Sequence, residues 1–291
     1  MSAPQAAGPA ADTPVTTSTP SGSNLVKRVG FATVAIPLAL LVVWVGGWLL
    51  AALLAVIAVL GARELFDLAS RRDIRPVRGP GLALAGAVPL LTWLALEGRA
   101  GMVAWLPYLG AGALLLVQTA VLFTRRAGER PLPAMAVTLF GVAYAAGLPA
   151  FLLAIRATYE SRSWAGAWLA FFPLVVTWVC DTAAMFGGRA IGGPKLFPSV
   201  SPGKTWSGSV AGVAGALVTV PLFDWAFLRP SGVALPLWQG LVFAFVLSIV
   251  GQVGDLAESL IKREAGVKDS SALIPGHGGV LDRLDSLYFV L

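Results

Sequence analysis

The stretch GWLLAALLAVIAVLGARELFDL, residues 47–68, decides the fold class, because it stays apolar over most of its length. A transmembrane α-helix needs roughly 20 predominantly apolar residues to cross a bilayer. Similar runs recur along the chain and predict about nine transmembrane helices, at 28–45, 47–68, 81–96, 101–124, 132–156, 165–187, 206–228, 234–262 and from near residue 280. We therefore expect an all-α, polytopic integral membrane protein.

The first and the last of these predicted helices have particular features. Gly46-Gly47 separates the first two runs and predicts a tight hairpin between them. The ninth run reaches only Leu291, so the last helix is expected either to be short and half-spanning or to lack further residues.

Composition supports the membrane assignment. The chain is 57% hydrophobic and 12% charged, whereas soluble domains carry about 25% charged residues. Cys180 is the single cysteine, which excludes an intramolecular disulfide, and with a single histidine it argues against a Cys/His zinc site. The net charge of +6 is spread in short clusters without a continuous basic face, so the expected partner is the lipid bilayer and not nucleic acid.

The sequence divides into three regions. Residues 1–23 are rich in Ala, Pro, Thr and Ser, with one charged side chain, which predicts a disordered tail. The tail lacks the basic and apolar regions of a secretory signal. Residues 24–160 form an N-terminal set of transmembrane helices, and 161–291 form a transmembrane region that carries the chemically unusual residues.

The distribution of basic residues predicts the orientation. With the N-terminus in the cytoplasm, all but four of the 21 Lys and Arg residues fall on the cytoplasmic side, as the positive-inside rule requires. Three polar stretches, 178–189, 192–209 and 254–286, then lie on that same side. Charges at membrane depth are functional by default, so we expect one site near the cytoplasmic face.

The stretch 254–286 presents reactive residues on a helix. Asp255, Ser259 and Lys262 share one face, and Glu258 lies beside them. Charges at such a position indicate a site, but for Glu258 and Lys262 an ion-paired helix end explains the pattern equally well.

Gly278 and Gly279 directly precede a helix whose first turn holds Asp282 and Asp285. Paired glycines at a helix start allow a phosphate to approach the backbone, and carboxylates from two helices suit Mg²⁺. The alternative for the acidic residues is a favourable interaction with the helix dipole.

The loop SPGKTWSGS, residues 201–209, combines a Pro-Gly turn, Lys204 and several hydroxyl groups. Such a loop can bind phosphates, although it lacks the spacing of a P-loop. The alternative is a polar loop whose Ser or Thr caps the next helix.

Residues 259–286, SLIKREAGVKDSSALIPGHGGVLDRLDS, closely resemble the signature of the phosphatidate cytidylyltransferases, also called CDP-diacylglycerol synthases. The pattern S-x-x-K-R, K-D, H-G-G-x-x-D-R-x-D is met at Ser259, Lys262, Arg263, Lys268, Asp269, His277, Gly278, Gly279, Asp282, Arg283 and Asp285. SPGKTW and the stretch around Asp181 also look like this family, so the specific resemblance covers the C-terminal region.

The resemblance implies a reaction of CTP with phosphatidate that gives CDP-diacylglycerol and pyrophosphate. It implies Mg²⁺ with a second cation nearby, a location in the inner (plasma) membrane and a homodimer. The implied metal ligands are Asp255, Asp282 and Asp181. The implied substrate-binding residues are Ser201, Lys204, Thr205, Ser259, Gly278 and Gly279.

The remaining signature residues have implied catalytic roles. Lys262, Arg263, Lys268 and Arg283 are expected to neutralise phosphatidate or pyrophosphate, and Asp269 and Asp285 either to contribute directly or to orient these basic residues. His277 is not required as a base, because the phosphate monoester that attacks is largely dianionic at neutral pH.

A second function class fits intramembrane carboxylates. An ion-coupled transporter could use Asp181 and Asp255 as its cation site, but transporters usually contain repeats and place the site near the midplane. The chain has no evident repeat, and its charges gather on one face. A CDP-alcohol phosphotransferase is a nearer enzymatic alternative, but its D-G-x-x-A-R motif is absent from the sequence.

Overall fold

Seven helices of the computed structural model are long and apolar enough to cross a membrane. The structure describes residues 33, 37–98, 104–273 and 278–291. The crossing helices are α2 (Gly47–Ser70), α3 (Arg78–Leu96), α4 (Leu106–Thr124), α5 (Pro131–Val142) with α6 (Leu148–Arg156), α7 (Trp164–Ile191), α8 (Trp206–Phe223) and α9 (Leu237–Glu264). They confirm the predicted all-α membrane architecture and match seven of the predicted spans.

The two outer predicted spans have different outcomes. The span 28–45 lies partly outside the described residues; its described residues, 33 and 37–45, are helical, and the helix ends where Gly46 and Gly47 both have positive φ. At the C-terminus the chain forms two short helices, α10 (Leu281–Leu284) and α11 (Leu287–Val290), which pack inside the molecule. The number nine therefore stays a prediction.

Two of the crossing helices contain π-helical turns. The turn η3 (Ala143–Gly147) joins α5 to α6, and η4 (Asp224–Leu228) continues α8 into the short 3₁₀ turn η5 (Arg229–Ser231). Another 3₁₀ turn, η2 (Ala127–Glu129), precedes α5. Membrane helices tolerate such irregularities where neighbouring helices cover the backbone.

Small residues bring α7 and α8 into close contact. A Cβ atom at Gly208 would lie 2.7 Å from the Ala184 carbonyl, and one at Gly212 would lie 3.0 Å from the Cys180 carbonyl. Without a hydrophobic driving force between helices in lipid, such close packing is a main source of helix association. The sequence of α8 thus fixes its position against α7, the helix that carries Asp181.

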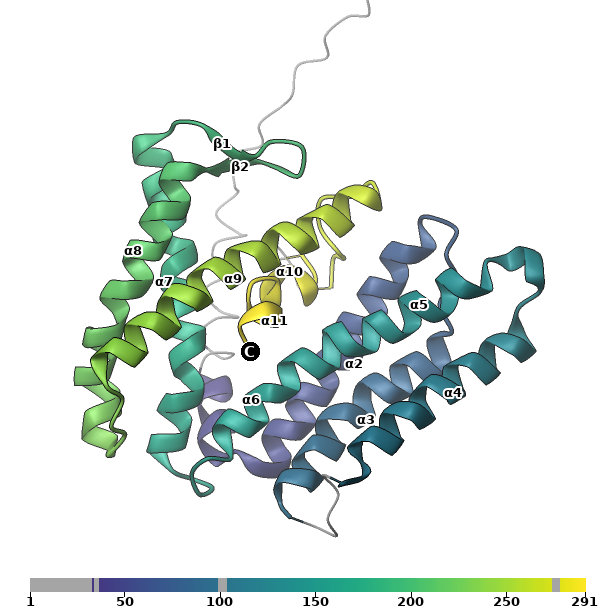
Figure 1. Cartoon of the computed structure of the whole chain (residues 1–291), viewed down its shortest axis with the longest axis horizontal. Helices are drawn as coiled ribbons and strands as arrows, with labels where there is room; N and C mark the ends of the chain where they lie inside the picture. Colours follow the sequence, from purple (N-terminus) through teal and green to yellow (C-terminus); the bar gives the residue numbers. More distant parts are fainter. Residues whose placement is uncertain (1–32, 34–36, 99–103, 274–277) are drawn as a thin grey trace, which may run out of the picture.

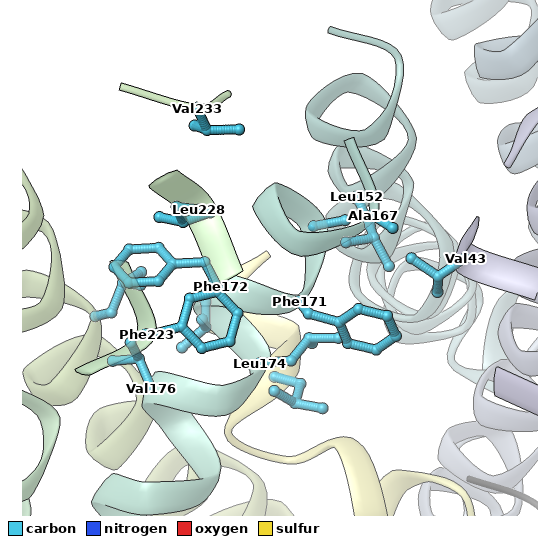
Figure 2. Close-up of a cluster of buried hydrophobic side chains, with 14 of the residues drawn as sticks. Val43, Leu152, Ala167, Phe171, Phe172, Leu174, Val176, Phe223, Leu228 and Val233 are labelled. Carbon is cyan, nitrogen blue, oxygen red and sulfur yellow. The ribbon is translucent and has the colours of Figure 1, made fainter. Parts of the chain in front are cut away.

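Two clusters of buried apolar side chains hold the helices together. The larger one is centred on α7 and includes Phe171, Phe172 and Val176 together with Phe223 of α8 (Figure 2). The smaller one joins α2 to the C-terminal helices through Phe66, Leu281 and Tyr288. The C-terminal segment is therefore anchored in the interior between the two halves of the chain.

The polar loop after α7 is a β-hairpin, which the sequence analysis did not predict. Strand β1 (Lys195–Phe197) pairs antiparallel with β2 (Ser201–Thr205). The hairpin extends beyond α7 and α8 at the end of the molecule to which the C-terminus of α9 also points (Figure 1). The loops that follow α2, α4 and α9 lie at this same end, so the alternation of the spans brings the polar stretches together as expected.

Arg156 is one of the four basic residues that the predicted orientation leaves outside, and it has a structural role at the opposite end. Its guanidinium group is buried and donates to the backbone carbonyls of Val43 (2.7 Å), Trp44 (2.7 Å), Tyr159 (3.3 Å) and Glu160 (3.0 Å). The carbonyl groups at a helix end lack intrahelical partners, so Arg156 satisfies the end of the 37–45 helix and the loop after α6.

Candidate active site

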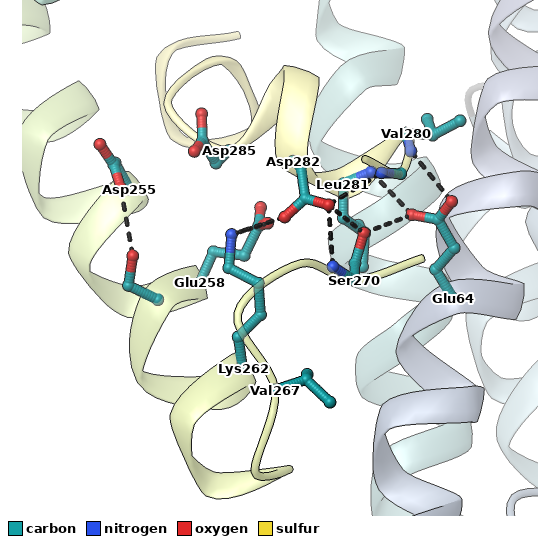
Figure 3. A network of polar contacts seen from close by, with 12 residues as sticks. Glu64, Asp255, Glu258, Lys262, Val267, Ser270, Val280, Leu281, Asp282 and Asp285 are labelled. Carbon is teal, nitrogen blue, oxygen red and sulfur yellow. Dashed lines mark hydrogen bonds and ion pairs between the residues drawn. The ribbon is translucent and has the colours of Figure 1, made fainter. Parts of the chain in front are cut away.

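The C-terminal half of α9 places its polar residues on one face, as the helical spacing predicts. The Ser259 hydroxyl donates to Oδ1 of Asp255 at 3.3 Å, one turn earlier. Lys262 Nζ lies 3.1 Å from Oε1 of Glu258 and 2.7 Å from Oδ1 of Asp282 (Figure 3). The ion-paired alternative for Glu258 and Lys262 is thus present in the structure, and it is buried: Glu258 is 1% and Lys262 7% exposed.

Asp282 is fully engaged by donors from the protein. Its Oδ1 accepts from Lys262, and its Oδ2 accepts from the amides of Ser270 and Gly279, both at 2.8 Å, and lies 2.9 Å from the Ser270 hydroxyl. Burial would raise the pKa of Asp282, but the hydrogen bonds from Lys262 and two backbone amides outweigh it and hold the pKa below its usual range. In this arrangement Asp282 closes the loop before α10 and presents no free oxygen to a metal ion.

Glu64 of α2 is the residue that the sequence analysis missed. It is 4% exposed, and its carboxylate accepts hydrogen bonds from the backbone amides of Val280 and Leu281, both at 2.9 Å. The hydroxyl groups of Ser270 and Ser271 also donate to it, at 2.9 Å and 2.7 Å. One signal was available: an acidic residue within an apolar span is expected to have a function.

Gly278 and Gly279 approach protein carboxylates, where a phosphate had been expected. Gly278 has φ +81°, and a Cβ there would lie 2.6 Å from Asp282 Oδ2. A Cβ at Gly279 would overlap the Ser270 hydroxyl and Glu64 Oε2. The glycines are therefore required because the segment passes between two carboxylates, so this packing gives no support to their predicted role in substrate binding.

A second group of carboxylates lies on the other side of Lys262. Asp255 of α9 and Asp285 at the end of α10 are both labelled in Figure 3. The Ser286 hydroxyl lies 3.3 Å from Oδ2 of Asp181 on α7 and 3.4 Å from Oδ1 of Asp285. Burial, and next the negative charge of Asp255, raise the pKa of Asp285 to about 6. Three elements thus bring Asp181, Asp255 and Asp285 within electrostatic reach of one another.

Lys204 of β2 connects the hairpin to this carboxylate group. Its Nζ lies 2.5 Å from Oδ2 of Asp255, and both side chains are about one quarter exposed, at 27% and 26%. An ion pair that is open to solvent can exchange its partner at little cost. Lys204 is therefore placed where a negatively charged ligand would meet both a cation and the carboxylates of the site.

The chemistry of these residues suits a divalent cation, although the protein side chains alone do not complete its coordination. Carboxylate oxygens are the ligands that Mg²⁺ prefers, and Mg²⁺ usually completes its shell with water and substrate phosphates. Within the described ranges, no three His, Cys, Asp or Glu side chains form a group that could hold a metal ion. The predicted metal roles of Asp181 and Asp255 therefore stay predictions, and Asp282 would have to release a present partner to bind a metal ion.

The predicted loop residues have mixed positions. Ser201 lies half-exposed at the start of β2. Thr205 is the N-cap of α8, and its hydroxyl oxygen accepts from the Gly208 amide at 3.1 Å, so the capping alternative holds at this residue. Ser209 donates to the side-chain oxygen of Gln252 on α9 at 2.5 Å. The Ser209 contact joins α8 to α9, the helix that carries Asp255, next to the hairpin.

The other signature residues lie at the edge of the site. Arg263 donates to the backbone carbonyls of Val200, at 3.3 Å, and Val267, at 3.0 Å. Lys268, Asp269 and Arg283 are exposed. His277 lies outside the described residues.

Comparison with known proteins gives the same family as the resemblance of the signature segment. The model of the "Cytidylyltransferase family" matches residues 26–291. A phosphatidate cytidylyltransferase of Brucella suis is 53% identical over 116 residues, which are 40% of this chain and 41% of that protein. The chain thus spans less than half the length of this bacterial relative.

A relative that aligns over more of the chain comes from a plant. Phosphatidate cytidylyltransferase 4, chloroplastic, of Arabidopsis thaliana is 33% identical over 299 aligned positions, covering 92% of this chain and 71% of that protein. One from Staphylococcus saprophyticus is 46% identical over 133 residues, 46% of this chain and 49% of that protein. This chain belongs to the cytidylyltransferase family.

Proposed function

We propose that the protein is a phosphatidate cytidylyltransferase, which converts CTP and phosphatidate to CDP-diacylglycerol and pyrophosphate. The observation that supports this most directly is the contact of Lys204 with Asp255 beside the signature segment. This contact joins the hairpin, which resembles a phosphate-binding loop, to the acidic face of α9. Both lie with the signature residues at one end of the membrane helix bundle (Figure 1). The names of the relatives support the same activity.

The reaction needs charge neutralisation more than a base. The attacking phosphate monoester of phosphatidate is largely dianionic at neutral pH, because its second pKa is about 6. One of its oxygens forms a bond to the α-phosphorus of CTP, and the bond from that phosphorus to the pyrophosphate oxygen breaks. Both reactants are anions, so positioning and electrostatic stabilisation supply most of the catalysis.

The basic residues divide between the two substrates in this proposal. Lys204, with Ser201 at the start of the same strand, binds the phosphates of CTP. Arg263, Lys268 and Arg283 lie at the exposed edge of the site, where a lipid head group arrives from the membrane surface. Lys262 is buried between Glu258 and Asp282 and stabilises charge from within the site.

Mg²⁺ is part of the proposal. Asp255 and Asp181 would hold it, with Asp285 nearby, and Asp282 would join them through Oδ1 if Lys262 turned to a substrate phosphate. When bound, such an ion neutralises the CTP phosphates and orients the leaving group. A second cation in the same group of carboxylates, and a homodimer, are further parts of the proposal.

The orientation is proposed from the charges. The polar end of the molecule carries most of the basic residues, which favours the cytoplasmic side of the inner membrane. CTP is available on that side. The N-terminus would then lie in the cytoplasm.

Transfer of label from CTP to lipid tests the proposal. The purified protein in phosphatidate-containing nanodiscs, with Mg²⁺ and CTP labelled at the α-phosphorus, should move the label into the chloroform phase, and only when phosphatidate is present. An ion-coupled transporter would label no lipid. Folded protein that transfers no label at saturating CTP and Mg²⁺ would contradict the proposed activity.

A further inference from the structure

We infer that Glu64 is a positioning residue, which fixes the Gly279–Leu281 backbone from the N-terminal half of the chain. Figure 3 shows its carboxylate pointing from α2 at the start of α10. The inference concerns the local structure of this segment, and only its consequence for catalysis rests on the proposed function.

The contacts of Glu64 are unusually complete for a carboxylate in an apolar helix. Oε1 accepts from the Val280 amide and the Ser271 hydroxyl, and Oε2 accepts from the Leu281 amide and the Ser270 hydroxyl. Two of the donors, the amides of Val280 and Leu281, belong to the segment at the start of α10, and the other two are the hydroxyl groups of Ser270 and Ser271. A buried carboxylate needs such donors to stay in place, so the start of α10 and Glu64 fix each other.

Glu64 also keeps this segment in place independently of Asp282. The Ser270 hydroxyl lies 2.9 Å from Glu64 Oε2 and 2.9 Å from Asp282 Oδ2, but it has a single proton and can donate to only one of them. If Asp282 exchanged its partners, this proton would remain available to Glu64. The amides of Val280 and Leu281 bind Glu64 and not Asp282, so Glu64 would still hold the start of α10.

The space around Gly279 supports the same conclusion. A Cβ at this position would overlap Glu64 Oε2, as noted above. The backbone at Gly279 thus lies so close to Glu64 that a side chain would not fit, and this explains the glycine at position 279. Because Asp282 and Arg283 follow directly, a displaced Glu64 carboxylate would shift the residues at the edge of the site.

Hydrogen exchange measures this role without any assay of activity. In the full-length protein in nanodiscs, Glu64→Gln replaces one acceptor oxygen with a donor. We expect amides in the segment 278–282 to exchange at least about tenfold faster, because buried amides that lose their acceptor are protected only by residual structure. Exchange in α7 and α8 should not change. Unchanged exchange in 278–282 would overturn the inference.

Asp67→Asn is the matched control, because Asp67 lies on the same helix, is about half exposed and pairs with Arg78 at 2.6 Å. It should leave exchange in 278–282 at the wild-type rate. An equal increase in both variants would mean that α2 as a whole, and not the Glu64 carboxylate, protects the segment, and this too would overturn the inference.

Gly279→Ala tests the contact between Gly279 and the Glu64 carboxylate by changing the glycine. It replaces Glu64→Gln in the experiment if that variant does not insert into the membrane. The added methyl group must displace Glu64 or Ser270, so the same amides should exchange faster. In the double variant with Glu64→Gln the increase should be less than the product of the two single effects, since both disrupt one contact. Independent effects would count against the inference.

Kinetics separate positioning from a loss of folded protein. If the proposed function holds, Glu64→Gln should raise the KM for phosphatidate about fivefold or more, because Arg283 follows the displaced segment, and leave the KM for CTP within about twofold. A smaller folded fraction would change neither KM. Unchanged values of both would remove the catalytic consequence; absence of activity in the wild type would instead refute the proposed function and leave the exchange result standing.

Discussion

Lys262 of α9 lies 2.7 Å from Oδ1 of Asp282 and so joins the crossing helix to the signature segment. The same ammonium group lies 3.1 Å from Glu258, whose other oxygen, Oε2, is buried without a hydrogen-bond partner among the described residues. One cation therefore neutralises two buried carboxylates. This arrangement makes Lys262 important for stability as well as for charge in the site.

Replacing Lys262 with methionine should destabilise the protein by about 3–5 kcal/mol, because removal of one partner leaves buried charges uncompensated. Thermal unfolding in detergent measures the effect. Adding Glu258→Gln to this variant should recover part of the loss, since one of the two unpaired charges is then absent. Lys268→Met, an exposed lysine of the same signature, is the control and should unfold near the wild-type temperature. If Lys262→Met unfolds at the wild-type temperature, the ion pairs of Lys262 with Glu258 and Asp282 do not contribute to stability.

Lys204→Ala should raise the KM for CTP about tenfold while kcat falls no more than about threefold. The reason is that Lys204 is proposed to bind the CTP phosphates equally in the ground state and the transition state. Steady-state rates at varied CTP and saturating phosphatidate give both constants. Lys195→Ala, an exposed lysine on the neighbouring strand, should leave both unchanged. A fall in kcat at unchanged KM would mean that Lys204 stabilises only the transition state and does not contribute to the binding of CTP.

The crossing helices could be predicted because the bilayer fixes the length of an apolar run. The expected spans 47–68 and 206–228 correspond to Gly47–Ser70 and Trp206–Ser231. The last run stays a predicted span, but most of its apolar residues are buried in the protein, where α10 and α11 pack against other helices. Apolar composition alone does not distinguish burial in lipid from burial in protein.

The site could be predicted only where residues are close in the sequence. The face of Asp255, Ser259 and Lys262 followed from the helical period. The hairpin was missed because its strands are short and Pro202-Gly203 interrupts the pattern. Glu64 was missed because its partners lie more than 200 positions away, as with the Ser270 hydroxyl at a separation of 206. Such a contact depends on how α2 packs against the C-terminal segment, which local spacing does not record.

The orientation in the membrane can be measured with single cysteines in a Cys180→Ala background. Cysteine at Arg71 or Asp269, both exposed at the polar end, should resist an impermeant reagent in intact cells, and cysteine at Glu160 should react. Ser270 is unsuitable as a labelling site, because its buried hydroxyl contacts Glu64 and Asp282. Labelling of residue 71 or 269 from outside would reverse the proposed orientation.

Asp255 and Asp282 should respond differently to the same substitution. Asp282→Asn removes the negative charge that pairs with Lys262 and replaces one of the two acceptor oxygens with a donor, so it should lower both the unfolding temperature and the turnover. Asp255→Asn affects one partly exposed ion pair, so the unfolding temperature should hardly change. Its turnover should nevertheless fall by about a hundredfold or more if the carboxylate is needed for the cation, since such residues act as a unit.

The double variant and a magnesium titration complete this test. If both carboxylates serve one cation, Asp255→Asn with Asp282→Asn should turn over scarcely more slowly than the slower single variant. Excess Mg²⁺ should restore part of the activity of Asp255→Asn, because a weakened site fills at higher concentration. If Asp282→Asn keeps wild-type turnover at saturating Mg²⁺ and loses only stability, its carboxylate acts solely in closing the loop before α10. The metal would then be left to Asp255 and Asp181, on the open side of Lys262.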